Sequence, residues 1–360
     1  MGTPAFALPS LEALAAATDL VGVVSQPDKP QGRGLAPLAS PVARAAAARG
    51  IPLIRPAKLR DPEALAALAA WRPDLVVVAA YGKILPRVIL ELPALAPINV
   101  HASLLPRHRG AAPIAAAILA GDSVTGITIM LMSEGMDAGD ILLQRPLAIE
   151  PDDTTATLGT RLAALGGRAL AEALVLLSGP GLTPVAQDPA LVTYAPRLTK
   201  DDGRIHWREP AVTIERKARA FTPWPSAFTA LGGRTVKILR ARVAPGAGGA
   251  GPVGDAGPAS GADRASTAGG GGAAAGSAGS TGAAAAAGGT GGEGGVASVP
   301  AASPLGTTPG TIVALGESIR VATGTGMIDL LTLQMEGRKP LAAPAFVSGA
   351  RLVAGARFDD

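Results

Sequence analysis

The sequence predicts an α/β protein, with a doubly wound and mostly parallel sheet in its first 190 residues and a small β-barrel after them. Short apolar runs alternate with Ala- and Leu-rich helical patterns over residues 1–190. Strand-like patterns return beyond residue 206, where a tract of mostly Gly, Ala, Ser, Thr and Pro (residues 245–310) divides them. Alternating strands and helices are typical of a Rossmann-like sheet with helices on both faces.

The elements of the first 190 residues follow from local patterns. The apolar runs predict four buried strands, at Leu20–Ser25, Leu75–Ala79, Pro97–His101 and Gly126–Met132. The helical patterns between them cover Leu8–Ala17, Pro41–Ala48, Pro62–Ala70 and Ala112–Ala120.

The start of the chain departs from this pattern. Gly2-Thr3-Pro4 has the character of a turn between a first strand and a first helix, yet no strand precedes it. In a Rossmann-like sheet this strand would be central. We therefore expect that the first strand is missing, and that Met1 is an internal methionine mistaken for a start.

The remaining sequence predicts the domain organisation. A catalytic domain is expected over residues 1–190, a linker over 191–205 and a β-barrel domain over 206–360, with strand patterns at Thr235–Val243 and Thr311–Glu336. The 245–310 tract cannot bury enough apolar surface to offset its ordering entropy, so we predict a disordered insertion in the barrel.

Composition excludes several classes of protein. The chain has no cysteine and three histidines, none spaced three or four residues from another, so we predict no metal site and no disulfide. We find no apolar run long enough to span a membrane and no basic segment of a signal peptide, which predicts a cytoplasmic location.

The positive charge is concentrated in the C-terminal half. From Ala195 onward there are 17 Lys and Arg against 12 Asp and Glu, whereas the preceding residues have 15 against 16. A mildly basic half suits a polyanionic partner. Ordinary surface charge explains the same numbers.

Candidate catalytic residues lie between Ile98 and Leu142. Asn99 and His101 are two apart on a predicted strand, so their side chains share one face, at the strand end where open sheets bind ligands. Asp137 follows the next predicted strand in a loop bounded by glycines.

These residue types suit acyl transfer to an amine. An Asn amide and an imidazole N–H can donate to a tetrahedral oxyanion, and a carboxylate can orient the histidine and help to move the amine's proton. A strand cap, a satisfied polar histidine and a turn aspartate account equally well for the spacing alone.

Two further segments are candidate binding sites. Ser103-Leu104-Leu105-Pro106 follows His101, and Pro106 favours an extended backbone that presents amides and apolar side chains to a flat ligand. The polar loop Gln26–Gly34 carries Lys29 and Arg33, either of which can pair with phosphate. Each segment also fits an ordinary surface loop.

Taken together, the motifs resemble the methionyl-tRNA formyltransferase family. The stretch NVHASLLPRHRGAAPI is highly specific for folate-dependent formyltransferases. The similarity covers nearly everything except 245–310, through Gly2–Pro4, Gln26–Gly34, Ala79–Pro86, Ile98–Ile114, Met136–Leu142, Val192–Leu198, Ala218–Phe228 and Leu330–Leu352. The family's usual strand before GTP is absent here, and the 245–310 tract is longer than the usual family loop.

The resemblance implies an activity and roles. It implies that 10-formyltetrahydrofolate donates a formyl group to the α-amine of initiator methionyl-tRNA, with Asn99, His101 and Asp137 as catalytic residues. Ser103–Pro106 would contact the folate, Lys29 and Arg33 would lie in a loop that enters the acceptor stem, and an OB-like C-terminal barrel would hold the tRNA. It also implies a monomer.

Two other functions remain open from the sequence. One is formyl transfer to a small amino sugar or nucleotide, for which the basic C-terminal half would be incidental. The other is a nucleic-acid-binding module that has lost catalysis together with its first strand.

Overall fold

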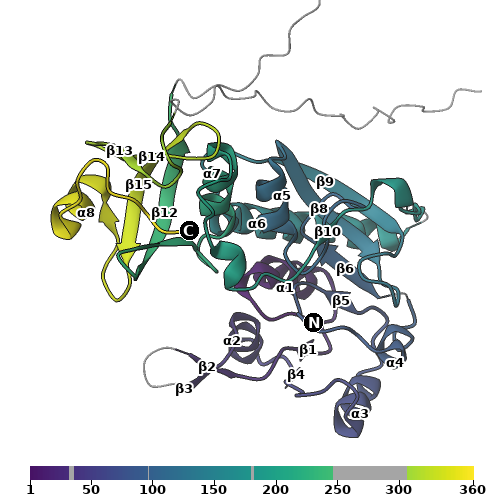
Figure 1. Ribbon diagram of the computed structural model, residues 1–360. Helices are drawn as coiled ribbons and strands as arrows, with labels where there is room; N and C mark the ends of the chain where they lie inside the picture. The colour runs from purple at the N-terminus through teal and green to yellow at the C-terminus, as the bar shows by residue number, and fades with distance from the viewer. Residues whose placement is uncertain (32–35, 96, 180–181, 246–305) are drawn as a thin grey trace, which may run out of the picture.

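The structure is a computed structural model that describes residues 1–31, 36–95, 97–179, 182–245 and 306–360. Figure 1 shows an α/β part, coloured purple to teal, beside a β-rich part in green and yellow. Arg33 and residues 246–305 of the predicted insertion lie outside the described residues. No helix in the described ranges is long and apolar enough to cross a membrane.

The N-terminal strands form a mixed sheet. β5 (Val77–Val78) pairs in parallel with β6 (Ile98–His101), whereas β8 (Val124–Leu131) pairs antiparallel with both β6 and β9 (Ile141–Ala148). The prediction of a mostly parallel sheet is therefore only partly correct. β8 and β9 are joined by a short loop, which suffices for antiparallel neighbours, whereas parallel neighbours need a longer crossover.

Three smaller strand pairs accompany this sheet. β1 (Val23–Val24) pairs in parallel with β4 (Leu53–Ile54), and β10 (Tyr194–Ala195) pairs in parallel with β7 (Arg109–Gly110). β2 (Lys29–Gln31) and β3 (Ala36–Leu38) form an antiparallel hairpin. The strands predicted at Leu20–Ser25 and Leu75–Ala79 exist as β1 and β5, but only two residues of each form a ladder.

Met1 and Gly2 lie between β1 and β5, where a central strand is expected. The Gly2 N–H donates to the Val24 carbonyl at 3.0 Å, and the Ala79 N–H donates to the Met1 carbonyl at 2.9 Å. The Met1 ammonium donates to the Val77 carbonyl at 2.6 Å, and burial lowers its pKa to about 5. Gln26 Nε2 adds a bond across the gap, to the Tyr81 carbonyl at 2.7 Å. In the described residues β1 and β4 nevertheless form a sheet separate from that of β5, β6, β8 and β9.

The helices of the α/β part largely match the sequence prediction. They are α1 (Leu8–Ala17), α2 (Pro41–Ala48), α3 (Pro62–Ala70), α4 (Arg87–Leu90), α5 (Pro113–Ala120) and α6 (Thr155–Leu177), with the short 3₁₀ helices η1 (Ala5–Ala7), η2 (Pro189–Leu191) and η3 (Asp201–Gly203). The sequence analysis did not predict α6, the longest of them. It begins with a capping box in which Thr154 and Thr157 satisfy each other's main-chain N–H groups.

The two faces of the sheet pack against different cores. Val77, Ile98 and Val100 belong to the core that includes residues of α1 and α6. Val76 and Val78 face a second core that includes residues of α3 and α4. Because side chains alternate along a strand, Asn99 and His101 lie on the face opposite Ile98 and Val100.

The C-terminal part is an antiparallel β domain with two helices. The strands have the order β11-β12-β15-β14-β13, with β16 beside β15. Their bounds are β11 (Ala227–Leu231), β12 (Arg234–Val243), β13 (Ile312–Leu315), β14 (Ile319–Ala322), β15 (Met327–Met335) and β16 (Leu341–Ala342). The helices are α7 (Ala211–Ala220) and α8 (Ala343–Ala350). Strands from both sides of the 245–310 tract thus share one sheet, as the sequence predicts.

The core of this domain is closed by an aromatic pair. Trp207 and Phe358 are fully buried, and their rings stack with centroids 5.4 Å apart. Trp207 Nε1 donates to Thr229 Oγ1, which donates to the Asp359 carbonyl. Phe358, near the end of the chain, is therefore part of the core.

The two domains meet along α5 and α7, which lie side by side in Figure 1. Thr155 Oγ1 donates to the Ala220 carbonyl at 2.5 Å, and Arg219 Nη1 donates to the Asp153 carbonyl at 3.2 Å. These contacts join the end of α7 to the start of α6.

Candidate active site

Asn99 and His101 lie at the carboxyl end of β6 and on one face of it. β6 is held between β5 and β8, where Asn99 is paired with Met130 and His101 with Thr128. Asn99 is half-buried, and His101 is 5% exposed. A central strand position fixes both side chains toward the same space.

Asp137 comes from the loop between β8 and β9 and meets both residues. Asn99 Nδ2 donates to Asp137 Oδ1 at 3.3 Å, and His101 Nδ1 lies 3.6 Å from Asp137 Oδ2. The Gly110 N–H donates to the same Oδ2 at 2.9 Å. The structure therefore brings together the three residues that the sequence singles out, although Asp137 is distant from the other two along the chain.

The loop that carries Asp137 is fixed from outside. Asp137 has φ +48°, which is unusual for a residue with a side chain. Gln187 Nε2 donates to the carbonyls of Asp137 at 2.8 Å and of Gly139 at 2.7 Å. Arg109 in turn donates to Gln187 Oε1 through Nε and Nη2. This network holds the Asp137 carboxylate toward β6.

Burial and two neighbouring groups shift the pKa of His101 in opposite directions. Burial lowers its pKa below the ordinary 6.5, while the Asp137 carboxylate and the hydrogen bond to the His108 carbonyl act in the opposite direction. Nε2 lies 3.0 Å from the His108 carbonyl, which can only accept, so the neutral ring carries its proton on Nε2. Nδ1 then faces Asp137 with a free electron pair.

The segment Ser103–Pro106 follows β6 and is bound to the sheet. Thr128 Oγ1 donates to the Ser103 carbonyl at 2.6 Å and accepts from the Leu105 N–H at 3.1 Å. Ser103 and Leu105 are buried, whereas Leu104 and Pro106 are half-buried. The Leu105 amide, which the sequence analysis offered to a ligand, is thus engaged within the protein.

The structure describes the main chain of one of the two candidate tRNA-binding residues. Lys29 lies in β2, whose hairpin with β3 is drawn apart from β6 in Figure 1. Arg33 is outside the described residues.

Several residues around the site were not predicted from the sequence. Gly110 and Gln187 fix Asp137, and the His108 carbonyl fixes His101. Gly110 has φ +127°, and a Cβ there would lie 2.4 Å from the Ala195 carbonyl oxygen. The glycine in RHRGAAP was the one available signal, because Gly is common where two backbones approach closely.

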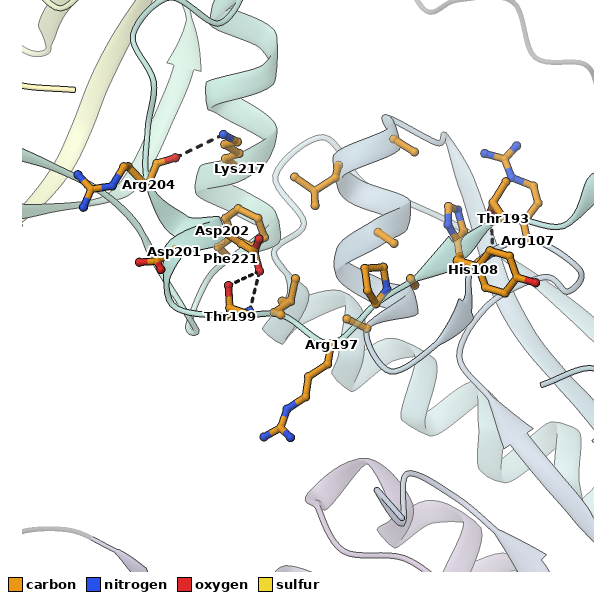
Figure 2. Close-up of a pocket in the computed structure, with 18 of the residues that line it drawn as sticks. Arg107, His108, Thr193, Arg197, Thr199, Asp201, Asp202, Arg204, Lys217 and Phe221 are labelled. Atoms are coloured by element: carbon orange, nitrogen blue, oxygen red, sulfur yellow. Dashed lines mark hydrogen bonds between the residues drawn. The ribbon is translucent and has the colours of Figure 1, made fainter. Parts of the chain in front are cut away.

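A pocket of about 720 Å³ lies beside this site, at the junction of the two domains. Its lining includes His108 and Thr193 from the α/β part, Lys217 from α7, and Phe221, which directly follows α7. Figure 2 shows His108 and Thr193 on one side and Lys217 with Phe221 on the other. Asn99, His101 and Asp137 do not line it. The pocket therefore adjoins the catalytic candidates through His108.

No cluster of three or more possible metal-binding side chains occurs in the part of the chain that the structure describes. The site consists of amide, imidazole, carboxylate and main-chain groups, which can donate hydrogen bonds and transfer a proton.

Two family models match the chain. The Formyl transferase family matches residues 6–174, and the Formyl transferase C-terminal domain matches residues 197–267 and 293–351. The chain is similar to the methionyl-tRNA formyltransferase of Myxococcus xanthus (strain DK1622), with 41% identity over 99% of this chain and 96% of that protein. The one from Anaeromyxobacter sp. (strain K) is 56% identical over 69% of this chain and 79% of its own.

Solved structures share the fold. HypX from Aquifex aeolicus in complex with tetrahydrofolic acid has a TM-score of 0.51 and 16% identity, covering 84% of this chain and 43% of that chain. The sugar 3N-formyltransferase WlaRD has a TM-score of 0.52 and 18% identity, covering 68% of this chain and 85% of that chain. By its fold, its two matched domains and its full-length relatives, the chain belongs to the methionyl-tRNA formyltransferase family.

Proposed function

We propose that this protein transfers the formyl group of 10-formyltetrahydrofolate to the α-amine of methionine on initiator methionyl-tRNA, for translation initiation. The observation that carries the proposal is the meeting of Asn99, His101 and Asp137 at the end of β6. The family membership and the relatives' names supply the substrates.

In this reaction a C–N bond forms between the methionine amine and the formyl carbon, and the bond from that carbon to the folate nitrogen breaks. The attack creates an oxyanion on the formyl oxygen. Asn99 Nδ2 uses one hydrogen for Asp137, so its second hydrogen is available to this oxyanion. Removal of one such donor typically costs about 100- to 1000-fold in rate.

His101 and Asp137 together receive the proton of the attacking amine. Since Nε2–H is bound to the His108 carbonyl, the free basic position is Nδ1, beside the Asp137 carboxylate. Protonation of Nδ1 gives an imidazolium between the His108 carbonyl and Asp137, and its positive charge stabilises the oxyanion. The proton then returns to the folate nitrogen as it leaves.

The folate is a substrate of this reaction, and we assign its contacts to the segment Ser103–Pro106. This segment directly follows His101, and its half-buried members Leu104 and Pro106 are apolar. The bonds from Thr128 fix its backbone, so these two side chains are the groups available to a flat pterin ring. We propose no metal in the reaction.

The remaining assignments concern the tRNA. Lys29 and Arg33 are proposed contacts to its phosphates, and the basic C-terminal domain, as an OB-like barrel, is proposed to hold the molecule. We further propose a cytoplasmic monomer, with a catalytic domain over residues 1–190, a linker over 191–205 and the barrel domain over 206–360. In this scheme the 245–310 tract is a surface insertion.

Formylation assays test the proposed substrates. The full chain with 10-formyltetrahydrofolate is incubated with charged initiator tRNA and, separately, with a dTDP-amino sugar. We expect formyl-methionyl-tRNA, no formylated sugar nucleotide, and a KM for tRNA that rises steeply with salt. Formylation of the sugar alone would overturn the tRNA assignment, and binding of tRNA without turnover would indicate a nucleic-acid-binding module. Size measurement in solution tests the monomer.

A further inference from the structure

We propose that Thr193 is a positioning residue for His101: it holds the His108 main chain so that the His108 carbonyl selects the reactive nitrogen of His101. This inference rests on the proposed function, since it concerns which imidazole nitrogen takes the amine's proton. It adds a residue that touches neither substrate nor the catalytic side chains.

His108 has an unusual main-chain conformation. This residue has φ +60°, in the left-handed region that few residues with side chains adopt. Such a conformation persists only where surrounding contacts impose it. It directs the His108 carbonyl at His101 Nε2, 3.0 Å away.

Two hydrogen bonds hold His108 in this conformation, one to its main chain and one to its ring. The His108 N–H donates to Thr193 Oγ1 at 2.8 Å, from the segment that precedes β10. The His108 ring donates through Nε2 to Asp122 Oδ2 at 2.7 Å, and Arg107 donates to the other oxygen of Asp122 at 2.6 Å. His108 is 6% exposed, so both anchors act on a buried residue.

The His108 carbonyl determines which ring nitrogen of His101 carries the proton. The two ring nitrogens face acceptors, the His108 carbonyl at Nε2 and the Asp137 carboxylate at Nδ1. A neutral imidazole has one N–H, and without the His108 carbonyl the proton would move to Nδ1 to meet Asp137. Nδ1 would then have no electron pair for the amine's proton. Thr193 therefore keeps Nδ1 basic.

The test is nitrogen-15 NMR of the full chain together with steady-state kinetics. The chain has three histidines, His101, His108 and His206, so single substitutions assign the ring signals. In the wild type we expect an Nε2–H tautomer for His101. In Thr193→Val we expect a shift toward Nδ1–H and a fall in kcat of about 10- to 100-fold, with KM for tRNA changed less than about 2-fold.

The variant set separates positioning from folding. Thr193→Ser retains the hydroxyl and should restore both the tautomer and kcat. Thr154→Val is the matched control, because its Oγ1 also accepts a main-chain N–H, from Thr157, but at the start of α6. If Thr193→Val fails to fold, Thr193→Ala removes the same hydroxyl with a smaller side chain and is measured by the same two methods.

An unchanged His101 tautomer in Thr193→Val, or in Thr193→Ala where that variant replaces it, overturns the proposal. So does a loss of kcat that Thr193→Ser does not restore. The NMR measurement needs no turnover, so it tests the positioning role even where the wild-type chain fails to formylate methionyl-tRNA, a result that would overturn the proposed function alone.

Discussion

Replacing Gly110 by alanine should damage the site through two backbone contacts at once. Gly110 has φ +127°, and its N–H donates to Asp137 Oδ2 at 2.9 Å. An added Cβ would lie 2.4 Å from the Ala195 carbonyl oxygen and 3.1 Å from the Ala195 carbonyl carbon, both main-chain atoms of β10. A shift of β7 would move the N–H away from Asp137, and a shift of β10 would disturb the bonds that the Ala195 carbonyl accepts from Ala111 and Ala112.

The expected magnitudes follow from these contacts. A hydrogen bond to a charged group contributes about 1.5–3 kcal/mol, which corresponds to a fall in kcat of about 10- to 160-fold if the bond matters fully in the transition state. A non-glycine residue in this backbone region costs about 1–3 kcal/mol of stability. In a domain of this size each kcal/mol lowers Tm by about 2–4 °C.

The assay is kcat for formylation and Tm by circular dichroism, for Gly110→Ala and for Gly159→Ala. Gly159 lies in α6, and a Cβ there meets Ile114 Cδ1 at an ordinary 3.6 Å, so this control should keep both values. If Gly110→Ala keeps wild-type kcat and Tm, then the β7–β10 contact does not position Asp137 as described.

Four further predictions concern single side chains. His101→Ala should remain folded by circular dichroism and lose about 100- to 1000-fold in kcat, and near wild-type turnover would exclude a catalytic role. Because the Asp137 carboxylate raises the pKa of His101 against its burial, Asp137→Asn should lower that pKa further in an NMR titration, and a rise would contradict the geometry. Because the pKa of His101 is lowered in the folded protein, the unfolded chain binds more protons at this residue. The free energy of unfolding in urea should therefore fall as the pH drops below 6.5, and it should fall less in His101→Gln. An equal pH dependence in the two proteins would contradict the lowered pKa of His101. Phe358→Ala should cost about 3–5 kcal/mol in urea unfolding because it leaves Trp207 unstacked in a closed core, and a loss below about 1 kcal/mol would show that the chain end is dispensable.

The sequence predicts the helices better than the strands. α1, α2 and α3 begin and end at the predicted residues, because each has a local apolar pattern with Pro near its start. β9 was not predicted, because Gln144, Arg145 and Pro146 interrupt its alternation. These residues are tolerated because β9 lies at the edge of the sheet.

In the candidate site, too, contacts between residues close in the sequence were predicted from their spacing and contacts between residues far apart in the sequence were not. That Asn99 and His101 share a face follows from their spacing on a strand. That Asp137 meets them depends on the pairing of β6 with β8. Gln187 and Thr193 return to the site 50 and 85 residues after their partners Asp137 and His108. The spacing of residues in one sequence does not reveal such contacts, and the resemblance to a family supplied Asp137 but not Gln187 or Thr193.

The pairing of β10 with β7 determines where the catalytic unit ends. Residues Thr193–Ala195 fall in the predicted linker, yet they accept hydrogen bonds from the main-chain N–H groups of His108, Arg109 and Ala111. A chain cut before Thr193 would lose these bonds, whereas a chain cut after Pro196 would keep them. Recombination that exchanges C-terminal domains between relatives can therefore preserve catalysis only if the crossover falls beyond β10. The segment that must be inherited together with the catalytic residues thus extends past the sheet and helices that surround the site.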